Sequence, residues 1–242
     1  MVSYAGRGVH GDVVESLGSR VVGGQVAVGA TLDPRTLVDE MGVSLTVIRE
    51  ALKVIAGKGL VASRQKRGTF VRPRTDWNVL DGDVIRWRIE GGEAEVVLRD
   101  LAEMRSIVEP AAVRRAAERR TQEQLADLES ALDAMARAGS DAAEAVAADS
   151  AFHHALLVAS GNEMLARLHE LMAPALRARD SIVHGPHGCA DDPVPSHRAV
   201  LDAIRDGDAD RSGAAMAQLL AKAERDLDAA VRGGAAVRRG GS

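Results

Sequence analysis

Hydrophobic residues recur at helical spacing in three stretches between residues 10 and 57. The first stretch predicts a helix over His10–Val22, which the glycine pair after it should end. A short second helix is expected after Asp33, because Asp is a good N-cap, Pro34 suits the first helical position and Gly42 suits the C-terminal exit. A third helix is expected from the capping residue Ser44 to about residue 57.

The third helix is predicted to have two different faces. One face is hydrophobic and carries Ile48, Leu52 and Ile55. The opposite face carries three polar residues: Thr46, Arg49 and Lys53. After this helix, the stretch GLVASRQKRGTFV alternates around a probable turn glycine, Gly68, and predicts a β-hairpin. This order of elements predicts a winged helix-turn-helix: two helices, a tight turn, a two-faced helix and a basic hairpin.

From Glu93 onwards the pattern is helical and predicts about six helices and no strand. The predicted fold is therefore mainly α, with a winged helix-turn-helix (three helices plus a β-hairpin) in residues 1–75 and an all-α helical bundle in residues 93–231. Residues 76–92 are expected to be a linker and linking helix, and residues 232–242 a disordered tail. We interpret Trp77 and Trp87, in the linker, as anchors that dock the two domains.

Charge is divided unevenly along the chain. The net charge is −4, yet residues 1–75 hold 11 Lys and Arg against 6 Asp and Glu, so the remainder is strongly acidic. This asymmetry suggests a small module that binds a polyanion, attached to a larger module with another task. Together with the two-faced helix, the basic turn at Lys66 and Arg67 predicts DNA binding. The alternative is a solvated outer face on an ordinary helix.

Other features limit the cellular setting. No stretch approaches the roughly 18 apolar residues of a membrane span, and the N-terminus lacks the apolar segment of a signal peptide. A single cysteine, Cys189, excludes an intrachain disulfide and any CxxC motif. We therefore expect a cytoplasmic protein.

Candidate chemistry in the helical region centres on Asp149, His153 and His197. Asp149 and His153 are spaced i, i+4 within an apolar stripe, and His197 lies on the stripe of another helix. Buried polar groups are costly unless they are paired or bound, and this set suits a divalent metal such as Zn, Ni or Mn. The alternatives are a hydrogen-bonded Asp–His pair that holds the core together, or the metal centre of a hydrolase.

The stretch VSLTVIREALKVIAGKGLVASRQKRGTFV resembles the DNA-binding signature of the GntR family of bacterial transcription regulators, over residues 10–75. The resemblance implies contacts with operator DNA by Arg35, Ser44, Thr46, Arg49 and the wing tip near Gly68. Leu45 stands where the family commonly has an arginine. We expect a homodimer, because one short helix reads too few base pairs to be selective.

The stretches DSAFHHALLVASGN and HRAVLDAIRDGDADRSGAAM resemble the effector domain of the FadR subfamily, the FCD domain. In many members an Asp and three His bind a metal that helps to hold a carboxylate effector. Asp149, His153 and His197 match three of these positions, but Leu219 occupies the fourth, which implies a weakened site.

Further polar residues are candidates for effector binding. Arg105 matches a family position associated with the effector, although it could instead pair with Glu109 or Asp149. Asn162, Arg177 and Arg179 lie near predicted helix ends, where they could line the pocket or cap and solvate the helices. The resemblance thus implies a repressor without catalytic residues, which responds to a small carboxylate such as a sugar acid. The alternative is a metal-dependent hydrolase that uses Asp149, His153 and His197.

Overall fold

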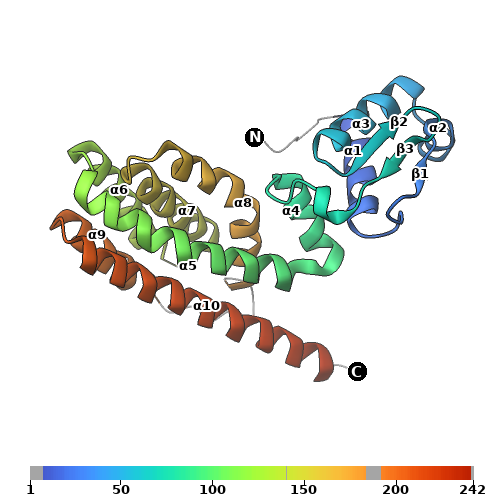
Figure 1. Cartoon of the computed structure of the whole chain (residues 1–242). Helices are drawn as coiled ribbons and strands as arrows, with labels where there is room; N and C mark the ends of the chain where they lie inside the picture. The colour runs from blue at the N-terminus through green and yellow to red at the C-terminus, as the bar shows by residue number, and fades with distance from the viewer. Residues whose placement is uncertain (1–7, 140, 184–191, 241–242) are drawn as a thin grey trace. The chain divides into compact units, whose positions relative to one another are not determined.

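The computed structural model describes residues 8–139, 141–183 and 192–240 (Figure 1). The chain separates into two compact units, Met1–Val97 and Leu98–Ser242. The segment predicted to be a linker, residues 76–92, therefore belongs to the first unit.

The first unit begins with three helices, α1 (Val9–Val22), α2 (Pro34–Met41) and α3 (Leu45–Gly57). The Asp33 carboxylate accepts a hydrogen bond from the amide of Thr36, and the Ser44 hydroxyl accepts one from the amide of Val47. Gly42 ends α2 in the left-handed conformation, with φ of 65°. The caps predicted for the second and third helices are therefore confirmed.

The first unit also contains a small antiparallel sheet. Its strands are β1 (Thr31–Leu32), β2 (Val61–Arg64) and β3 (Gly68–Val71), in the order β1-β3-β2. The predicted hairpin is confirmed as β2 and β3. Strand β1 was not predicted, because two residues are too few to show a periodic pattern. The three helices and this sheet form the winged helix-turn-helix.

The segment after the sheet contains the 3₁₀ turn η1 (Arg74–Asp76), the helix α4 (Gly82–Arg88) and the π-helical turn η2 (Ile89–Glu93). α4 packs against α1, and Trp87 is buried in the hydrophobic core of the first unit. Trp77 packs against the same core. The interpretation of both tryptophans as anchors between domains is therefore wrong, because both rings pack against the hydrophobic core of the first unit.

The position of Trp87 depends on a small residue in α1. A Cβ atom on Gly18 would overlap the Trp87 indole ring, so only glycine leaves room for it. The indole Nε1 donates a hydrogen bond to the Glu15 carboxylate, 2.8 Å away. α4 is thus fitted to α1 by both shape and polarity.

The second unit contains most of α5 (Ala94–Arg119) and five further helices: α6 (Gln122–Ala138), α7 (Ala142–Ala159), α8 (Glu163–Val183), α9 (Val194–Arg205) and α10 (Ala209–Gly240). The six helices expected from the pattern are confirmed, and the described part of this unit contains no strand. The backbone of α10 continues to Gly240, whereas the composition predicted a disordered tail from residue 232.

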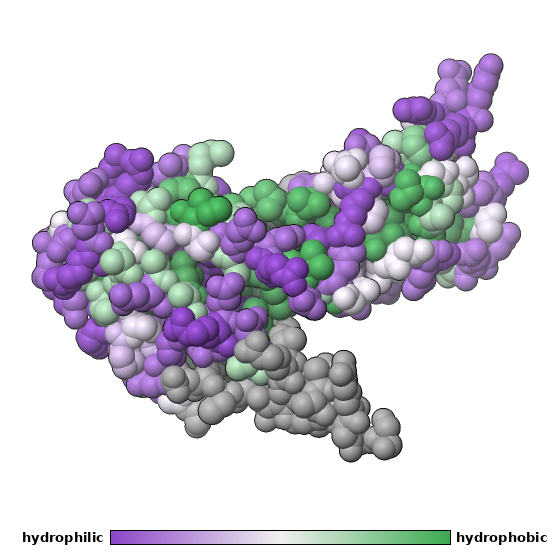
Figure 2. Space-filling view, turned by 60° about the horizontal axis from the view of Figure 1, so that its bottom comes forward, coloured by the Kyte–Doolittle hydropathy of each residue, from purple (hydrophilic) through white to green (hydrophobic). Residues whose placement is uncertain are grey.

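The helices of the second unit surround one hydrophobic core. α6 packs against α7 and α9, α8 packs against α7 and α10, and α9 packs against α10. α5 and α10 run side by side (Figure 1), where the Ser212 hydroxyl donates to the backbone carbonyl of Val113. Within the described residues, no helix is both long and apolar enough to cross a membrane. The surface drawn in Figure 2 carries hydrophilic residues among smaller apolar areas.

Candidate functional site

The outer face of α3 is the first candidate site. Ile48, Leu52 and Ile55 are buried in the core, while the polar residues Thr46, Arg49 and Lys53 are exposed on the opposite side. The predicted two-faced helix is thus confirmed. Lys53 forms an exposed ion pair with Glu50, at 2.7 Å, so its charge is partly compensated within the helix.

The other residues predicted to contact DNA also lie at the surface of the first unit. Arg35 is exposed in the first turn of α2, and Ser44 is exposed where α3 begins. At the hairpin turn, Lys66 and Gly68 both have positive φ angles, 66° and 78°. Arg67 stacks on the Phe70 ring, with its guanidinium carbon 3.9 Å from the ring centroid. The surface therefore combines donors on α2 and α3 with positive charge on the wing.

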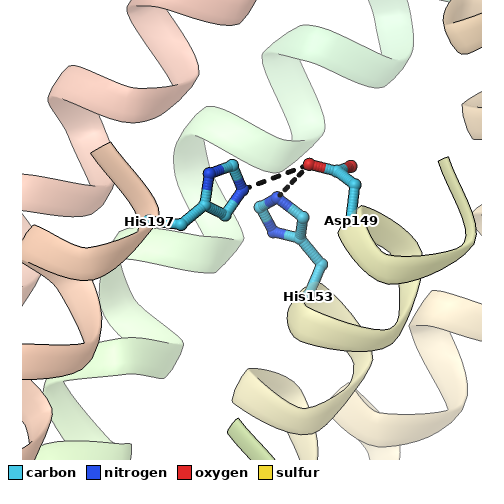
Figure 3. A group of neighbouring side chains, drawn as sticks. All are labelled: Asp149, His153 and His197. Atoms are coloured by element: carbon cyan, nitrogen blue, oxygen red, sulfur yellow. Dashed lines mark ion pairs between the residues drawn. The ribbon is translucent and has the colours of Figure 1, made fainter. Parts of the chain in front are cut away.

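The second candidate site is the cluster of Asp149, His153 and His197 in the helical unit (Figure 3). α7 positions Asp149 and His153 one turn apart, and α9 brings His197 to them from another side. Oδ1 of Asp149 lies 3.1 Å from Nε2 of His197 and 3.7 Å from Nε2 of His153. Both imidazoles are buried. The convergence predicted from the sequence is therefore present in the structure.

Each imidazole of the cluster points Nε2 towards Asp149 and is held in this orientation by a contact at Nδ1. Nδ1 of His153 lies 2.8 Å from Oε2 of Glu109, and Nδ1 of His197 lies 2.8 Å from the carbonyl oxygen of Pro193. These oxygens can only accept, so we assign the proton to Nδ1 in both rings. In the neutral rings, Nε2 then carries the lone pair that a metal needs.

Two ion pairs surround the cluster. Arg105 donates from Nε to Glu109, at 2.6 Å, and Arg179 donates from Nη2 to Asp149, at 3.2 Å. Burial alone would raise the pKa of each carboxyl group. For Glu109, the charge of Arg105 and the hydrogen bonds from Arg105 and His153 outweigh burial and lower the pKa well below its usual range. The pKa of Asp149 is lowered in the same way, by the neighbouring side chains of His153, His197 and Arg179. Both carboxylates are thus ionised and able to attract a cation.

The donor set fits a divalent metal. One ligand atom from each of the three side chains lies within 4.8 Å of the others. Nε2 of His197 is buried and makes no well-aligned hydrogen bond in the described part of the chain, although Asp149 is close to it. A buried acceptor without a partner is costly, and a coordinated cation would satisfy it. Leu219, at the expected fourth position, is buried in the hydrophobic core and offers no ligand atom.

Arg105 is deeply buried, with only 3% of it exposed. Charged residues are rarely buried, and the ion pair with Glu109 compensates much of the cost here. Nη2 of Arg105 also lies 3.1 Å from Nε2 and 3.2 Å from Nδ1 of His153. Because Nδ1 is assigned the proton and Nε2 the lone pair, Arg105 can donate only to Nε2, the atom that a metal would use.

A cavity of about 120 Å³ lies beside the cluster, between α5, α8 and α10. Arg105 and Arg179 line it, so both arginines belong to the cavity and to the cluster. Of the three candidates near helix ends, Arg179 is thus the one that lines the cavity.

Two other effector candidates lie elsewhere. The Asn162 side chain is exposed and caps α8, where its Oδ1 accepts from the amide of Met164. Asn162 therefore caps a helix, which was the alternative to lining the pocket. Arg177 is exposed and is not among the residues that line the cavity.

Glu109 is the residue of this site that the sequence did not identify. It was considered only as a pairing partner for Arg105, yet it also accepts from His153. The signal that could have found it is its i, i+4 spacing from Arg105 on the same helix.

Comparison with known proteins identifies both units. Residues 10–71 match the family model described as bacterial regulatory proteins, gntR family, and residues 100–222 match the FCD domain. The chain belongs to the GntR family. It carries the FCD domain that the resemblance implied, so the expected family and fold class are confirmed.

Relatives cover most of this GntR-family chain. The galactonate operon transcriptional repressor of Escherichia coli is 33% identical over 217 residues, which is 89% of this chain and 95% of the relative. The transcriptional repressor NanR of Cronobacter sakazakii is 29% identical, over 75% of this chain and 70% of its own. The fold also matches a solved structure of Lar from Listeria monocytogenes, with a TM-score of 0.59 at 16% identity, over 90% of this chain and 98% of that one.

These matches decide the class of function. This GntR-family chain is a transcription regulator and not an enzyme, which removes the hydrolase alternative. The cluster of Asp149, His153 and His197 lies in the FCD domain, where a ligand-responsive site is consistent with the family.

Proposed function

We propose that this regulator is a repressor that binds operator DNA as a homodimer and is released or rearranged by a small carboxylate bound in the helical unit. A divalent metal (Zn, Ni or Mn) held by Asp149, His153 and His197 would assist. The observation that supports the effector site best is the orientation of both imidazoles towards Asp149, beside a cavity that two arginines line. Sugar acids are one class to test, since galactonate appears in the name of a relative.

DNA recognition is assigned to the outer face of α3, with support from α2 and the wing. Arg49 and Thr46 are exposed on α3 and can reach base edges in a major groove. The remaining exposed residues would contact the sugar-phosphate backbone. These are Arg35, Ser44, Lys53, Lys66, Arg67 and the glycine turn at Gly68. A two-fold dimer on a pseudo-palindrome doubles the number of base pairs that are read.

The metal would supply positive charge to one carboxylate oxygen of the effector. The protein residues would supply the rest of the site. Arg105 has two donors on Nη1 that bond to no described residue, and a guanidinium can bind a carboxylate through two parallel hydrogen bonds. Arg105 must leave Nε2 of His153 when that atom serves as a ligand. Its Nη1 and Nη2 donors would then be available to the effector while Nε stays bonded to Glu109, which would couple the two binding events.

Fluorescence anisotropy would test the proposal. An operator is first selected from a random duplex library with the full-length protein, and light scattering then gives the mass of the free protein and of the complex. We expect two chains per duplex, and weaker binding to the operator when a carboxylate and a divalent metal are added together. A protein that remained monomeric on its selected operator would contradict the dimer. An operator affinity that no carboxylate changed, with or without metal, would contradict the effector role.

A further inference from the structure

The walls of the cavity beside the cluster are mostly hydrocarbon. Four buried leucines form its inner surface: Leu98 and Leu101 from α5, and Leu220 and Leu227 from α10. Four alanines of the same two helices make up half of the other lining residues. An apolar ligand segment would gain the hydrophobic free energy of leaving water here.

The polar groups of the cavity are few and unevenly placed. The two that lie deepest are the guanidinium groups of Arg105 and Arg179, next to the cluster. Ser106 and Glu224 also line the cavity, but both are exposed at its rim. The Ser106 hydroxyl already donates to the backbone carbonyl of Glu103, at 2.8 Å. The inner part of the cavity thus offers strong donors for an anion at one end.

Acceptors for ligand hydroxyl groups are scarce in the inner part. Guanidinium groups donate hydrogen bonds but do not accept them, and leucine and alanine side chains do not form hydrogen bonds. The backbone carbonyls of a helix already accept hydrogen bonds within the helix. A sugar acid carries a hydroxyl group on nearly every carbon. Each hydroxyl buried without an acceptor loses a hydrogen bond that water provided, which typically weakens binding by about tenfold or more.

The size of the cavity limits the length of the ligand. Its volume is about 120 Å³, a little less than the roughly 150 Å³ of a protein cavity that binds one benzene molecule. A short acid fills this volume. A six-carbon sugar acid exceeds it.

We infer that the effector is a short-chain monocarboxylate with an apolar tail, and not a polyhydroxylated sugar acid. Its carboxylate binds at Arg105 and Arg179, and its tail lies among the leucines of α5 and α10. The inference rests on the proposed function, because it assigns a ligand class to the same effector site.

The experiment is a calorimetric titration of the full-length protein with two sets of ligands, at fixed zinc concentration and again with a chelator. The first set is propionate, butyrate, valerate and hexanoate, and the second is gluconate and galactonate. We expect affinity to rise about fourfold per methylene group through butyrate and valerate. Both sugar acids should bind at least tenfold more weakly than valerate.

A pair of matched variants tests the location of the tail. Ala221 lines the cavity and Ala214 does not, and both are exposed alanines of α10. Ala221→Leu should weaken valerate binding about tenfold or more and propionate binding much less, because the added side chain shortens the space for the tail. Ala214→Leu, with the same change in size and helix propensity, should bind both acids as the unchanged protein does.

The possible outcomes separate this inference from the proposed function. If gluconate or galactonate bound as tightly as valerate, the ligand class would be wrong while the effector site stood. If Ala221→Leu left the chain-length series unchanged, the tail would not lie in this cavity and the inference would fail. If none of the acids bound in either condition, both the inference and the proposed effector role would be overturned.

Discussion

Nδ1 of His153 lies 2.8 Å from Oε2 of Glu109, and this contact determines which nitrogen of the imidazole is available to a metal. Because the carboxylate accepts the Nδ1 proton, Nε2 is left with its lone pair towards Asp149. Only 2% of each residue is exposed, so water cannot replace the contact. Glu109 therefore positions a ligand without being one.

Glu109→Gln should weaken zinc binding about 10- to 100-fold, the usual loss when the partner of a metal-bound histidine is changed. The amide can still accept a hydrogen bond but lacks the charge that makes the imidazole a stronger ligand. Calorimetric zinc titration measures the effect. Glu118→Gln, an exposed residue of the same helix, is the control and should bind zinc normally. Equal affinity in the two variants would mean that Glu109 has only a structural role.

Leu219→His should tighten metal binding, because an imidazole would occupy the fourth position of the family's ligand set. Leu219 is 5% exposed and lies in the hydrophobic core with Met216 and Leu220, so the unchanged protein offers only three side-chain ligands there. We expect the unchanged protein to lose zinc readily to a chelator and to stay folded, and Leu219→His to retain zinc longer.

Leu219→Met is the matched control for this change, since it alters the shape of the core but adds no nitrogen ligand. Metal content after dialysis against a chelator distinguishes the three proteins. A histidine variant that lost zinc as fast as the methionine variant would show that position 219 cannot reach the site.

Arg49→Ala should cost about 1–3 kcal/mol of specific operator binding, as expected for a base contact or a well-formed phosphate contact. Arg49 is exposed on the outer face of α3, and no ion pair joins it to another described residue. Anisotropy titrations at several salt concentrations separate its contribution to base reading from that to phosphate contact. Arg115→Ala, at an exposed position of α5, controls for the loss of one positive charge. If both variants bound the operator as the unchanged protein does, the orientation assigned to α3 would be wrong.

The features that the sequence predicted well depend on neighbouring residues. Asp33, Ser44 and Gly42 act as caps because a cap needs only the adjacent turn of helix. The buried face of α3 followed from helical periodicity in the same way. The i, i+4 relation between Asp149 and His153 also required nothing beyond one helix, so this part of the cluster could be anticipated.

The features that the sequence missed depend on distant partners. Trp87 is in the core of the first unit because Gly18, 69 positions earlier, leaves space for its ring. The burial of Arg105 depends on contacts with both Glu109 and His153, and the latter belongs to another helix. Periodicity shows that a residue faces inward or outward, but it does not show which partner compensates a buried charge.

Lys58→Met should destabilise the first unit by about 3–5 kcal/mol, the usual cost of removing one partner from a buried ion pair. The Lys58 ammonium lies 2.8 Å from Asp81 and 2.7 Å from Asp83, and all three residues are buried. Burial lowers the pKa of Lys58, but the two carboxylates outweigh it and raise the pKa overall, so the lysine is charged.

Thermal unfolding followed by circular dichroism measures this loss, with the exposed Lys53→Met as the control. Because the folded pKa of Lys58 is raised, its contribution should persist from neutral pH up to the ordinary lysine pKa and disappear as the pH rises through the raised one. A loss of less than 1 kcal/mol at neutral pH would show that the network is unimportant for stability.

Arg105→Met should change the two binding affinities in opposite directions. In the unchanged protein, Nη2 of Arg105 lies 3.1 Å from Nε2 of His153, so removing the guanidinium takes a positive charge away from that nitrogen. It also leaves the Glu109 carboxylate without its arginine partner. Both changes favour a cation, so zinc should bind more tightly. The effector carboxylate loses its two-pronged donor, so its affinity should fall about 10- to 100-fold, the range of hydrogen bonds to charged groups. Separate calorimetric titrations with zinc and with valerate measure both affinities, and thermal unfolding confirms that the variant is folded. A purely structural role would weaken both kinds of binding, and that result would show that Arg105 does not exchange between His153 and the effector.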